Sequence, residues 1–137
     1  MPSAPSPLPV LYDADCGFCR FSVARLLDWD RRHRLRPVSI QSAEGQALLA
    51  AVPPERRLET AHVVDADGTV RSGGAAAAAV ARVLPAGAPV ALVLAALPGP
   101  TDRAYRWVAD HRTAISRWVP SRWKRAAAAQ IARRENH

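Results

Sequence analysis

The sequence predicts a single domain of the α/β class. The chain has 137 residues, which is enough to bury one hydrophobic core and too few for two unrelated catalytic domains. Its composition, 49% hydrophobic and 23% charged, excludes an intrinsically disordered chain. Up to about residue 85, short apolar segments typical of strands alternate with longer segments that have helical periodicity. This alternation is typical of a sheet covered by helices.

The first predicted elements form a β-α-β unit. Residues 1 to 7 are rich in proline and predict a disordered lead-in. Residues 8 to 12 predict a buried strand, residues 16 to 33 a helix, and residues 35 to 40 a second strand. The crossover between these two strands makes them parallel. Because Pro37 lacks the N–H that a sheet ladder needs, we expect the second strand at an edge of the sheet.

A helix, a hairpin and a further helix complete this domain. Residues 43 to 52 predict a helix, which a pair of prolines ends. Residues 62 to 71 predict a hairpin in which Gly68 supplies the positive φ angle of the turn. Ser72 is placed to cap a third helix through the alanine-rich segment that follows. The order β-α-β-α-β-β-α over residues 8 to 85 is that of a thioredoxin-like domain.

Residues 86 to 137 predict a helical C-terminal extension that is part of the same unit. An apolar stretch punctuated by proline and glycine reaches Pro100, and helices follow over about residues 101 to 118 and 121 to 134. One stripe of the first of these helices is interpreted as packing surface and consists of Ala104, Trp107, Val108, His111, Ile115 and Trp118.

The formal net charge of +7 is concentrated in this extension. Residues 1 to 100 carry about +1, and residues 101 to 137 carry +6. All but one of the basic residues are arginine and alanine is abundant, so a coding bias explains the charge more simply than phosphate contacts do. We therefore expect no nucleic-acid partner. A peripheral membrane contact through the basic tail is left open.

The first ten residues and the longest apolar stretch do not predict export or membrane insertion. The first ten residues lack the basic and apolar regions of a secretion signal, so we expect the mature chain to begin near Met1. The longest apolar stretch, Ala86 to Pro98, has 13 residues, whereas roughly 20 are needed to span a bilayer. We expect a cytoplasmic protein, in a compartment where thiols stay reduced unless they take part in chemistry.

Cys16 and Cys19 are the only cysteines of the chain, so they cannot form the disulfide framework of a small secreted fold. They follow a predicted strand and open a helix, which is the context of a redox-active Cys-x-x-Cys motif. Free N–H groups and the helix dipole at this position favour the thiolate of Cys16, the candidate nucleophile. Cys19, one turn further and facing the core, suits a resolving thiol that closes the disulfide and releases the partner.

Acidic and aromatic residues next to the motif are further candidates for the site. Asp13 and Asp15 oppose ionisation of a nearby thiol, whereas one of them could accept the proton of Cys19 during exchange. The alternative is that both carboxylates only cap the turn and the helix. Asp13 is the better catalytic candidate. Phe18, Tyr12 and Asp15 are candidates for substrate contact, although Tyr12 suits an ordinary core position equally well.

Two other functions are compatible with the motif. A Cys-x-x-Cys pair between a strand and a helix also binds soft ions such as Cu(I), as a metal carrier would. The second alternative is an interaction module whose Arg- and Trp-rich tail binds an anionic membrane or nucleic acid, with the cysteines as a redox switch. A structural zinc site would need two more ligands, and the four histidines do not pair at zinc-finger spacing. For the favoured redox function, we expect no metal and no cofactor.

The segment Tyr12-Asp13-Ala14-Asp15-Cys16-Gly17-Phe18-Cys19 resembles the signature of the DCC family of thiol-disulfide oxidoreductases, named for its Asp-x-x-Cys-x-x-Cys motif. Asp13, Cys16 and Cys19 occupy the three named positions. The similarity includes the hairpin at residues 63 to 68. It also includes residues 105 to 112, which are similar to a Tyr-x-Trp-(Ile/Val)-Ala-x-x-Arg stretch of the family. The resemblance covers residues 8 to about 118 and implies a thioredoxin-like fold and dithiol–disulfide exchange with an unidentified partner.

Two departures from related proteins affect the expected site. Ala14 stands where many family members have glycine, so the turn must avoid a positive φ angle. Thioredoxins and glutaredoxins place a cis-proline before the third strand, and residues 59 to 62 contain no proline. The chain therefore lacks the residue on which docking of a substrate backbone depends in those proteins. The direction of exchange, the electron donor and the oligomeric state are left open.

Overall fold

Four strands form the sheet of the computed structural model, which describes residues 7 to 135. β1 (Leu8–Tyr12) pairs in parallel with β2 (Leu35–Ser39), and β3 (His62–Val64) pairs antiparallel with both β1 and β4 (Val70–Ser72). The strand order is β2-β1-β3-β4. The predicted parallel pair, the hairpin and the edge position of the strand that contains Pro37 are confirmed.

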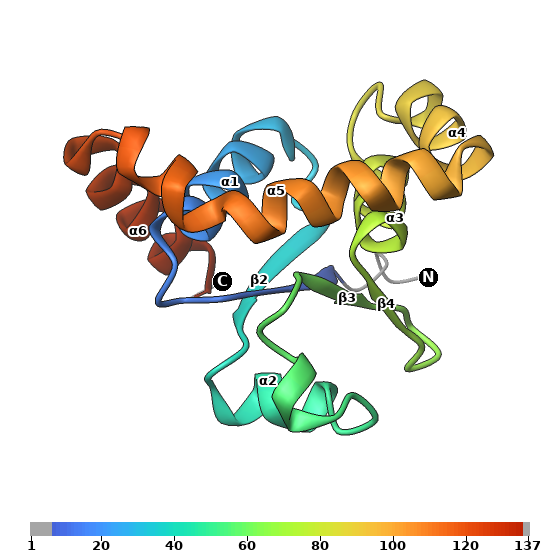
Figure 1. Cartoon of the computed structure of the whole chain (residues 1–137), viewed down its shortest axis with the longest axis horizontal. Coiled ribbons are helices and arrows are strands. Elements are labelled where there is room, and N and C mark those ends of the chain that lie inside the picture. The colour runs from blue at the N-terminus through green and yellow to red at the C-terminus, as the bar shows by residue number, and fades with distance from the viewer. Residues whose placement is uncertain (1–6, 136–137) are drawn as a thin grey trace, which may run out of the picture.

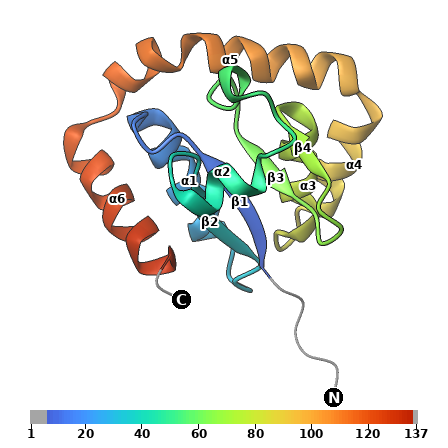
Figure 2. The same ribbon diagram turned by 90° about the horizontal axis from the view of Figure 1, so that it is seen from below.

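Helices cover both faces of the sheet (Figure 1). α1 and α3 lie on one face with α5 across them, and α2 lies on the other; Figure 2 shows α5 running from α4 at one end to α6 at the other. The bounds are α1 Gly17–Trp29, α2 Ala43–Leu48, the short 3-10 helix η1 Pro54–Arg56, α3 Gly74–Val83, α4 Ala88–Ala96, α5 Pro98–Trp118 and α6 Ser121–Glu135. This is a thioredoxin-like fold with a helical C-terminal extension, as predicted.

The structure does not test two of the predicted divisions of the chain, the lead-in and the boundary at residue 85. The predicted lead-in lies outside the described residues except for Pro7. The boundary at residue 85 stays a prediction. Within residues 7 to 135, no helix is both long enough and apolar enough to cross a membrane.

The alternation of side chains along β1 divides the core between the two faces of the sheet. Val10 and Tyr12 point to the face covered by α1 and α3, where they join the larger apolar cluster. Leu11 points to the other face, where it packs with Leu49 in a smaller cluster behind α2. β1 is therefore buried on both faces, and the segment that leaves its end is held in a fixed position.

α1 ends at Trp29 rather than at the predicted His33. The reason is Asp30, whose carboxylate accepts the backbone N–H of Arg34 at 2.8 Å and of Leu35 at 2.9 Å. These hydrogen bonds turn the chain out of the helix and into β2.

Two other predicted helix ends differ from the structure. α2 ends at Leu48, earlier than predicted, and tight turns lead to Pro53, whose ring disfavours helical geometry in the residue before it. Ser72 does not cap α3, because it is the last residue of β4 and its hydroxyl lies 2.6 Å from Nδ1 of His62. Gly73 takes the N-cap position instead.

The apolar stretch after α3 contains a helix that the sequence pattern did not predict. The sequence there is apolar and punctuated by proline and glycine. In the structure, Pro89 lies in the first turn of α4, where no backbone N–H is needed. α5 begins at Pro98 for the same reason, ahead of the predicted start at Thr101. Prolines at these positions begin helices rather than interrupt them.

The packing stripe predicted on α5 is wrong in part. Trp118 is 86% exposed and Trp107 58% exposed, and His111 stacks on Trp107 at the surface. The helix lies across α1 and α3 with a different face inward, which presents Tyr105 and Arg112 to the sheet domain. These two residues are two helical turns apart and share one face.

α6 packs along α1 and covers the C-terminal end of that helix. Ala127 and Ile131 are buried against it. Arg134 forms an ion pair with Asp30 at 2.5 Å, and the side chain of Asp30 has no exposed surface. One charge of the basic extension is therefore part of the interior.

Candidate functional site

The two cysteines lie where β1 gives way to α1. Cys16 is the N-cap residue of the helix, and its Sγ accepts the backbone N–H of Cys19 at 3.3 Å. A sulfur at this position faces the free N–H groups of the first helical turn, which stabilise a negative charge. Both thiols are partly buried and not joined in a disulfide. The predicted position of the motif at a helix start is confirmed by the structure.

The environment of the Cys19 thiol is less polar than water. Burial raises the pKa of Cys19 from 9.0 to about 12, and its interactions with the Cys16 side chain act in the same direction. Arg112 opposes this shift, because its Nη1 lies 3.8 Å from Sγ of Cys19. Asp13 has a smaller effect, which raises the pKa. Cys19 is therefore a protonated thiol next to one cation and one anion.

Asp13 is held by the ends of two parallel strands. It follows β1 directly, and Gln41 follows β2, so the two side chains meet at the same edge of the sheet. The Nε2 of Gln41 donates to Oδ1 of Asp13 at 2.7 Å, and the backbone N–H of Asp15 donates to the same oxygen at 3.0 Å. Ala14 does not have a positive φ angle, as predicted for this turn.

Arg112 connects Asp13 with Cys19. Its Nη2 lies 3.5 Å from Oδ2 of Asp13, while its Nη1 contacts the sulfur. The residues of the motif alone did not identify Arg112 or Gln41 as part of the site. A signal for Arg112 existed in the sequence, because it ends the stretch from Tyr105 that resembles the family. Gln41 follows a strand predicted to be parallel to β1, which was the available indication for it.

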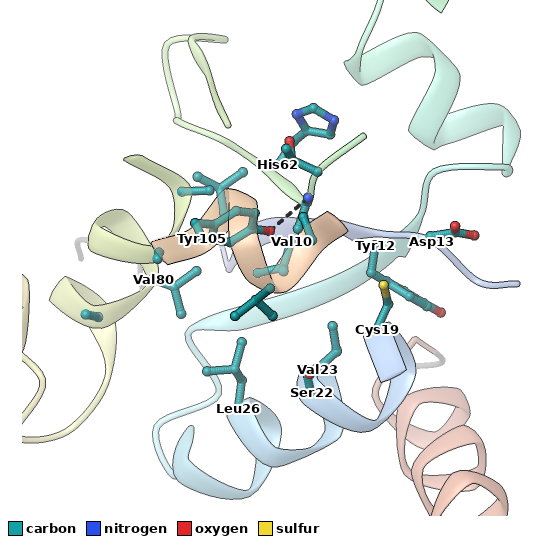
Figure 3. Close-up of a pocket in the computed structure, with 18 of the residues that line it drawn as sticks. Val10, Tyr12, Asp13, Cys19, Ser22, Val23, Leu26, His62, Val80 and Tyr105 are labelled. Carbon is teal, nitrogen blue, oxygen red and sulfur yellow. Dashed lines mark hydrogen bonds between the residues drawn. The ribbon is translucent and has the colours of Figure 1, made fainter. Parts of the chain in front are cut away.

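Tyr105 fixes α5 to the sheet. Its hydroxyl accepts the backbone N–H of Ala61 at 3.0 Å, just before β3 begins (Figure 3). Burial raises the pKa of the Tyr105 hydroxyl, so the phenol stays neutral. This hydrogen bond joins the extension to the segment just before β3.

The C-terminal helices also approach the motif closely at Gly17. A β-carbon at this position would lie 3.0 Å from Lys124 of α6 and 3.1 Å from the hydroxyl of Ser116 of α5. The absence of a side chain at Gly17 therefore allows both helices to approach the first turn of α1.

A cavity of about 370 Å³ lies between α1, the sheet, α3, α4 and α5. Figure 3 shows Cys19 and Asp13 near one end of it and Val80 and Leu26 near the other. Of the predicted contact residues, Tyr12 and Phe18 line the cavity with Cys19 and Asp13, and Tyr12 is also a buried core residue. Cys16 and Asp15 are not among its lining residues.

Asp15 is exposed on the turn before Cys16. Its Oδ2 accepts a longer hydrogen bond, of 3.4 Å, from Nε2 of Gln41. The structure therefore separates the predicted contact residues into two groups, with Asp15 on the solvent side of the motif and Phe18 and Tyr12 on the cavity side.

His62 has a structural position. It is buried, its Nδ1 contacts the hydroxyl of Ser72 and its Nε2 lies 2.8 Å from the carbonyl oxygen of Arg57. Burial lowers the pKa of His62, which keeps the ring neutral. In residues 7 to 135, no group of three or more His, Cys, Asp or Glu side chains is arranged to hold a metal ion. A two-thiolate site for Cu(I) would place the ion next to the Arg112 guanidinium.

The arrangement combines a thiol at a helix N-terminus, a second thiol one turn away and an arginine–carboxylate pair beside the second sulfur. No curated protein and no solved structure matches the chain. A family model described as DCC1-like thiol-disulfide oxidoreductase matches residues 10–118. The match includes both cysteines, Asp13 and Arg112. With most of its length covered, the chain belongs to the DCC1-like thiol-disulfide oxidoreductase family.

Proposed function

We propose that the protein catalyses dithiol–disulfide exchange, with Cys16 as the attacking thiol and Cys19 as the resolving thiol. The observation that carries this assignment is the difference between the two sulfurs. Cys16 caps a helix and accepts a backbone N–H, whereas burial raises the pKa of Cys19 to about 12. Because only a thiolate attacks a disulfide, Cys16 is the sulfur prepared for the first step.

Cys19 acts in the second step. The Cys16 sulfur is by then in a mixed disulfide, so Cys19 must lose its proton and attack it to release the partner. The guanidinium of Arg112, 3.8 Å from the Cys19 sulfur, stabilises the negative charge that forms there. Loss of the negative charge on Cys16 also removes one of the interactions that raise the pKa of Cys19. Resolution therefore becomes easier after the partner has been captured.

Asp13 is the proposed acceptor of the Cys19 proton, directly or through one water. It lies at the same end of the cavity as Cys19, and Gln41 and the Asp15 N–H hold its carboxylate by one oxygen. The other oxygen faces Arg112. Asp13 thus has two roles in this proposal: it balances the charge of Arg112 in the resting state and receives a proton during resolution.

The cytoplasmic location expected from the sequence is part of this proposal. Thiols in that compartment are kept reduced, so the dithiol form is the one that meets a substrate. We infer that the protein reduces a disulfide and is itself reduced again by a cellular dithiol donor. The substrate contacts Phe18 on the cavity side of the motif and Asp15 on the solvent side.

Turnover of a small disulfide tests the function. The reduced protein is supplied with bis(2-hydroxyethyl) disulfide and a dithiol reductant, and thiol release is compared for the wild type, Cys16→Ser and Cys19→Ser. We expect Cys16→Ser to lower the protein-dependent rate by at least about 100-fold, because no other described group replaces the thiolate. A rate that is unchanged in Cys16→Ser, or failure of the wild type to form a Cys16–Cys19 disulfide under mild oxidation, would overturn the proposal.

A further inference from the structure

The cavity beside Cys19 carries an inference about the substrate, and this inference rests on the exchange reaction proposed above. Its volume of about 370 Å³ falls within the range of small-molecule sites in proteins. A protein cavity of about 150 Å³ already holds benzene. The space is therefore large enough for a small organic molecule or for a substantial substituent of one.

The alanine run of α3 creates this space. Ala77 and Ala81 face the cavity with a single methyl group each, and larger side chains at these positions would fill it. On the opposite side of the cavity, the hydrogen bond from the Ala61 N–H to the Tyr105 hydroxyl fixes the position of α5 relative to the sheet. The cavity thus follows from the sequence of α3 and from the anchoring of α5.

The lining is apolar along most of its length and polar at one end. Val80 and Leu26 mark the apolar end, and Cys19 and Asp13 mark the polar end (Figure 3). Arg112 lies with the latter pair, in contact with both. The transfer of an apolar group from water into such a space is favourable in free energy. A reacting group on that occupant would lie among the thiol, the guanidinium and the carboxylate.

A polypeptide substrate fits this geometry poorly. The backbone N–H of Ala61, at the start of β3, is already donated to the Tyr105 hydroxyl at 3.0 Å. A peptide that added itself as a strand next to this segment would need such main-chain groups to be free. In addition, α5 lies across this face of the sheet (Figure 1). The residues around Cys19 therefore form a pocket for a small molecule rather than a groove for a chain.

We propose that the cavity binds the apolar substituent of a low-molecular-weight disulfide, R–S–S–R, with the substrate sulfur next to the two cysteines. The Cys16 thiolate attacks one sulfur of the substrate and forms Cys16–S–S–R, while the first RS⁻ leaves and takes a proton from water. Cys19 then gives up its proton, attacks the Cys16 sulfur and releases the second RS⁻, which is protonated in turn. The two cysteines lose two electrons, the substrate gains them, and an added dithiol such as dithiothreitol returns the protein to its reduced form.

Two isosteric disulfides test this substrate class with the wild-type protein alone. Di-n-propyl disulfide and bis(2-hydroxyethyl) disulfide have the same number of non-hydrogen atoms, but the first is apolar and the second carries two hydroxyls. Rates are divided by those of free dithiothreitol with the same compound, which removes their intrinsic difference in reactivity. We expect kcat/KM to favour the dipropyl compound by at least about tenfold, because a buried hydroxyl without a partner is disfavoured.

Filling the cavity provides the second arm of the test. Ala77→Leu extends a side chain into the cavity, and Ala75→Leu makes the same change at an exposed position of the same helix. We expect Ala77→Leu to lower the preference for the dipropyl compound to less than about threefold, and Ala75→Leu to keep it. If Ala77→Leu does not fold, Ala109→Leu fills the cavity from α5.

The outcomes separate this inference from the function on which it rests. Equal efficiency with both compounds, or faster reduction of insulin than of dipropyl disulfide, would overturn the assignment of an apolar small substrate and leave the exchange reaction intact. A preference that survives both cavity-filling variants would overturn the role of the cavity. If neither disulfide is reduced by the wild type, the proposed function fails and this inference fails with it.

Discussion

An aspartate and an arginine meet at each end of α1, and the two pairs differ in how completely their charges are satisfied. At the C-terminal end, Asp30 is fully buried, accepts two backbone N–H groups and pairs with Arg134. At the N-terminal end, the side chains of Asp13 and Arg112 are 12% and 24% exposed and their atoms lie 3.5 Å apart. Arg112 also contacts Cys19.

The difference between the pairs indicates different roles. The Asp30–Arg134 pair connects α1, the start of β2 and α6, and its partners leave little freedom for either side chain. The Asp13–Arg112 pair is longer and divides the guanidinium between a carboxylate and a sulfur. An arginine in this position can follow the negative charge when Cys19 ionises. The first pair is therefore expected to affect stability, and the second the rate of exchange.

The largest expected effect is on stability, at the C-terminal pair. Asp30→Ala leaves Arg134 without its carboxylate partner and two backbone N–H groups without their acceptor. We expect the free energy of unfolding to fall by about 3 to 5 kcal/mol, as for other broken buried pairs. Asp28→Ala is the control, since Asp28 lies on the same helix but is exposed, where it pairs with Arg25 and accepts a hydrogen bond from Gln130 of α6. It should change stability by less than about 1 kcal/mol. Denaturant unfolding measures both, and similar losses would contradict the distinction.

The next effect is kinetic and concerns Arg112. Arg112→Gln removes the cation beside Cys19, so we expect the resolving step to slow by about 10- to 100-fold. Formation of the mixed disulfide on Cys16 should change much less. Rapid mixing with a disulfide separates the two steps, because each releases one thiol. Arg106→Gln serves as the control, since Arg106 is on the same helix in an exposed pair with Asp102. Equal slowing of both steps in Arg112→Gln would indicate a structural role only.

Asp13 is expected to have a smaller effect, because its replacement has two opposing consequences. Asp13→Asn removes a proton acceptor, but it also leaves Arg112 free to stabilise the Cys19 thiolate. We expect the resolving step to slow by about tenfold, with mixed disulfide accumulating on Cys16 during turnover. Asp110→Asn makes the same change at an exposed position of α5 and should leave that step within about twofold. A faster resolving step in Asp13→Asn would show that charge balance, not proton transfer, is the role of Asp13.

The last expected effect is a pH dependence of stability, which is the smallest of these effects near neutral pH. Burial raises the pKa of Cys19 from 9.0 to about 12, so the thiol loses its proton earlier in the unfolded chain than in the folded one. Between these pH values the unfolded state binds fewer protons, and the stability of the reduced protein falls as the pH rises. Cys19→Ala removes this contribution, so its stability should fall less steeply over the same range. Parallel pH profiles of unfolding for the two proteins would contradict the assigned environment of Cys19.

The same comparison shows what the sequence could predict. Asp13, Cys16 and Cys19 follow β1 within a few residues, so their arrangement depends on local structure and on a recognisable motif. Arg112 comes from a helix far along the chain, and its position depends on how α5 lies across α1 and α3. The periodicity of α5 predicted a stripe that is partly wrong, because tryptophans at the surface have the same hydropathy as tryptophans in a core.

A helix boundary could likewise be predicted only where its cause is local. Asp30 ends α1 through hydrogen bonds to β2 and a charge from α6, which no local pattern in the sequence contains. By contrast, the hairpin around Gly68 was predictable, because the positive φ angle of that glycine, 86°, is a local requirement. The cavity could not be predicted, since an alanine run indicates a helix and does not indicate what lies opposite it.

Trapping of the mixed disulfide tests the central claim most directly, which is that Cys16 attacks and Cys19 resolves. The reduced Cys16→Ser and Cys19→Ser variants are each mixed with one equivalent of bis(2-hydroxyethyl) disulfide near neutral pH, and intact-protein mass spectrometry follows the adduct. We predict rapid formation of a stable adduct on Cys16 in Cys19→Ser, and formation at least about 100-fold slower in Cys16→Ser, where only the protonated Cys19 remains. Faster adduct formation on Cys19 than on Cys16 would contradict the account.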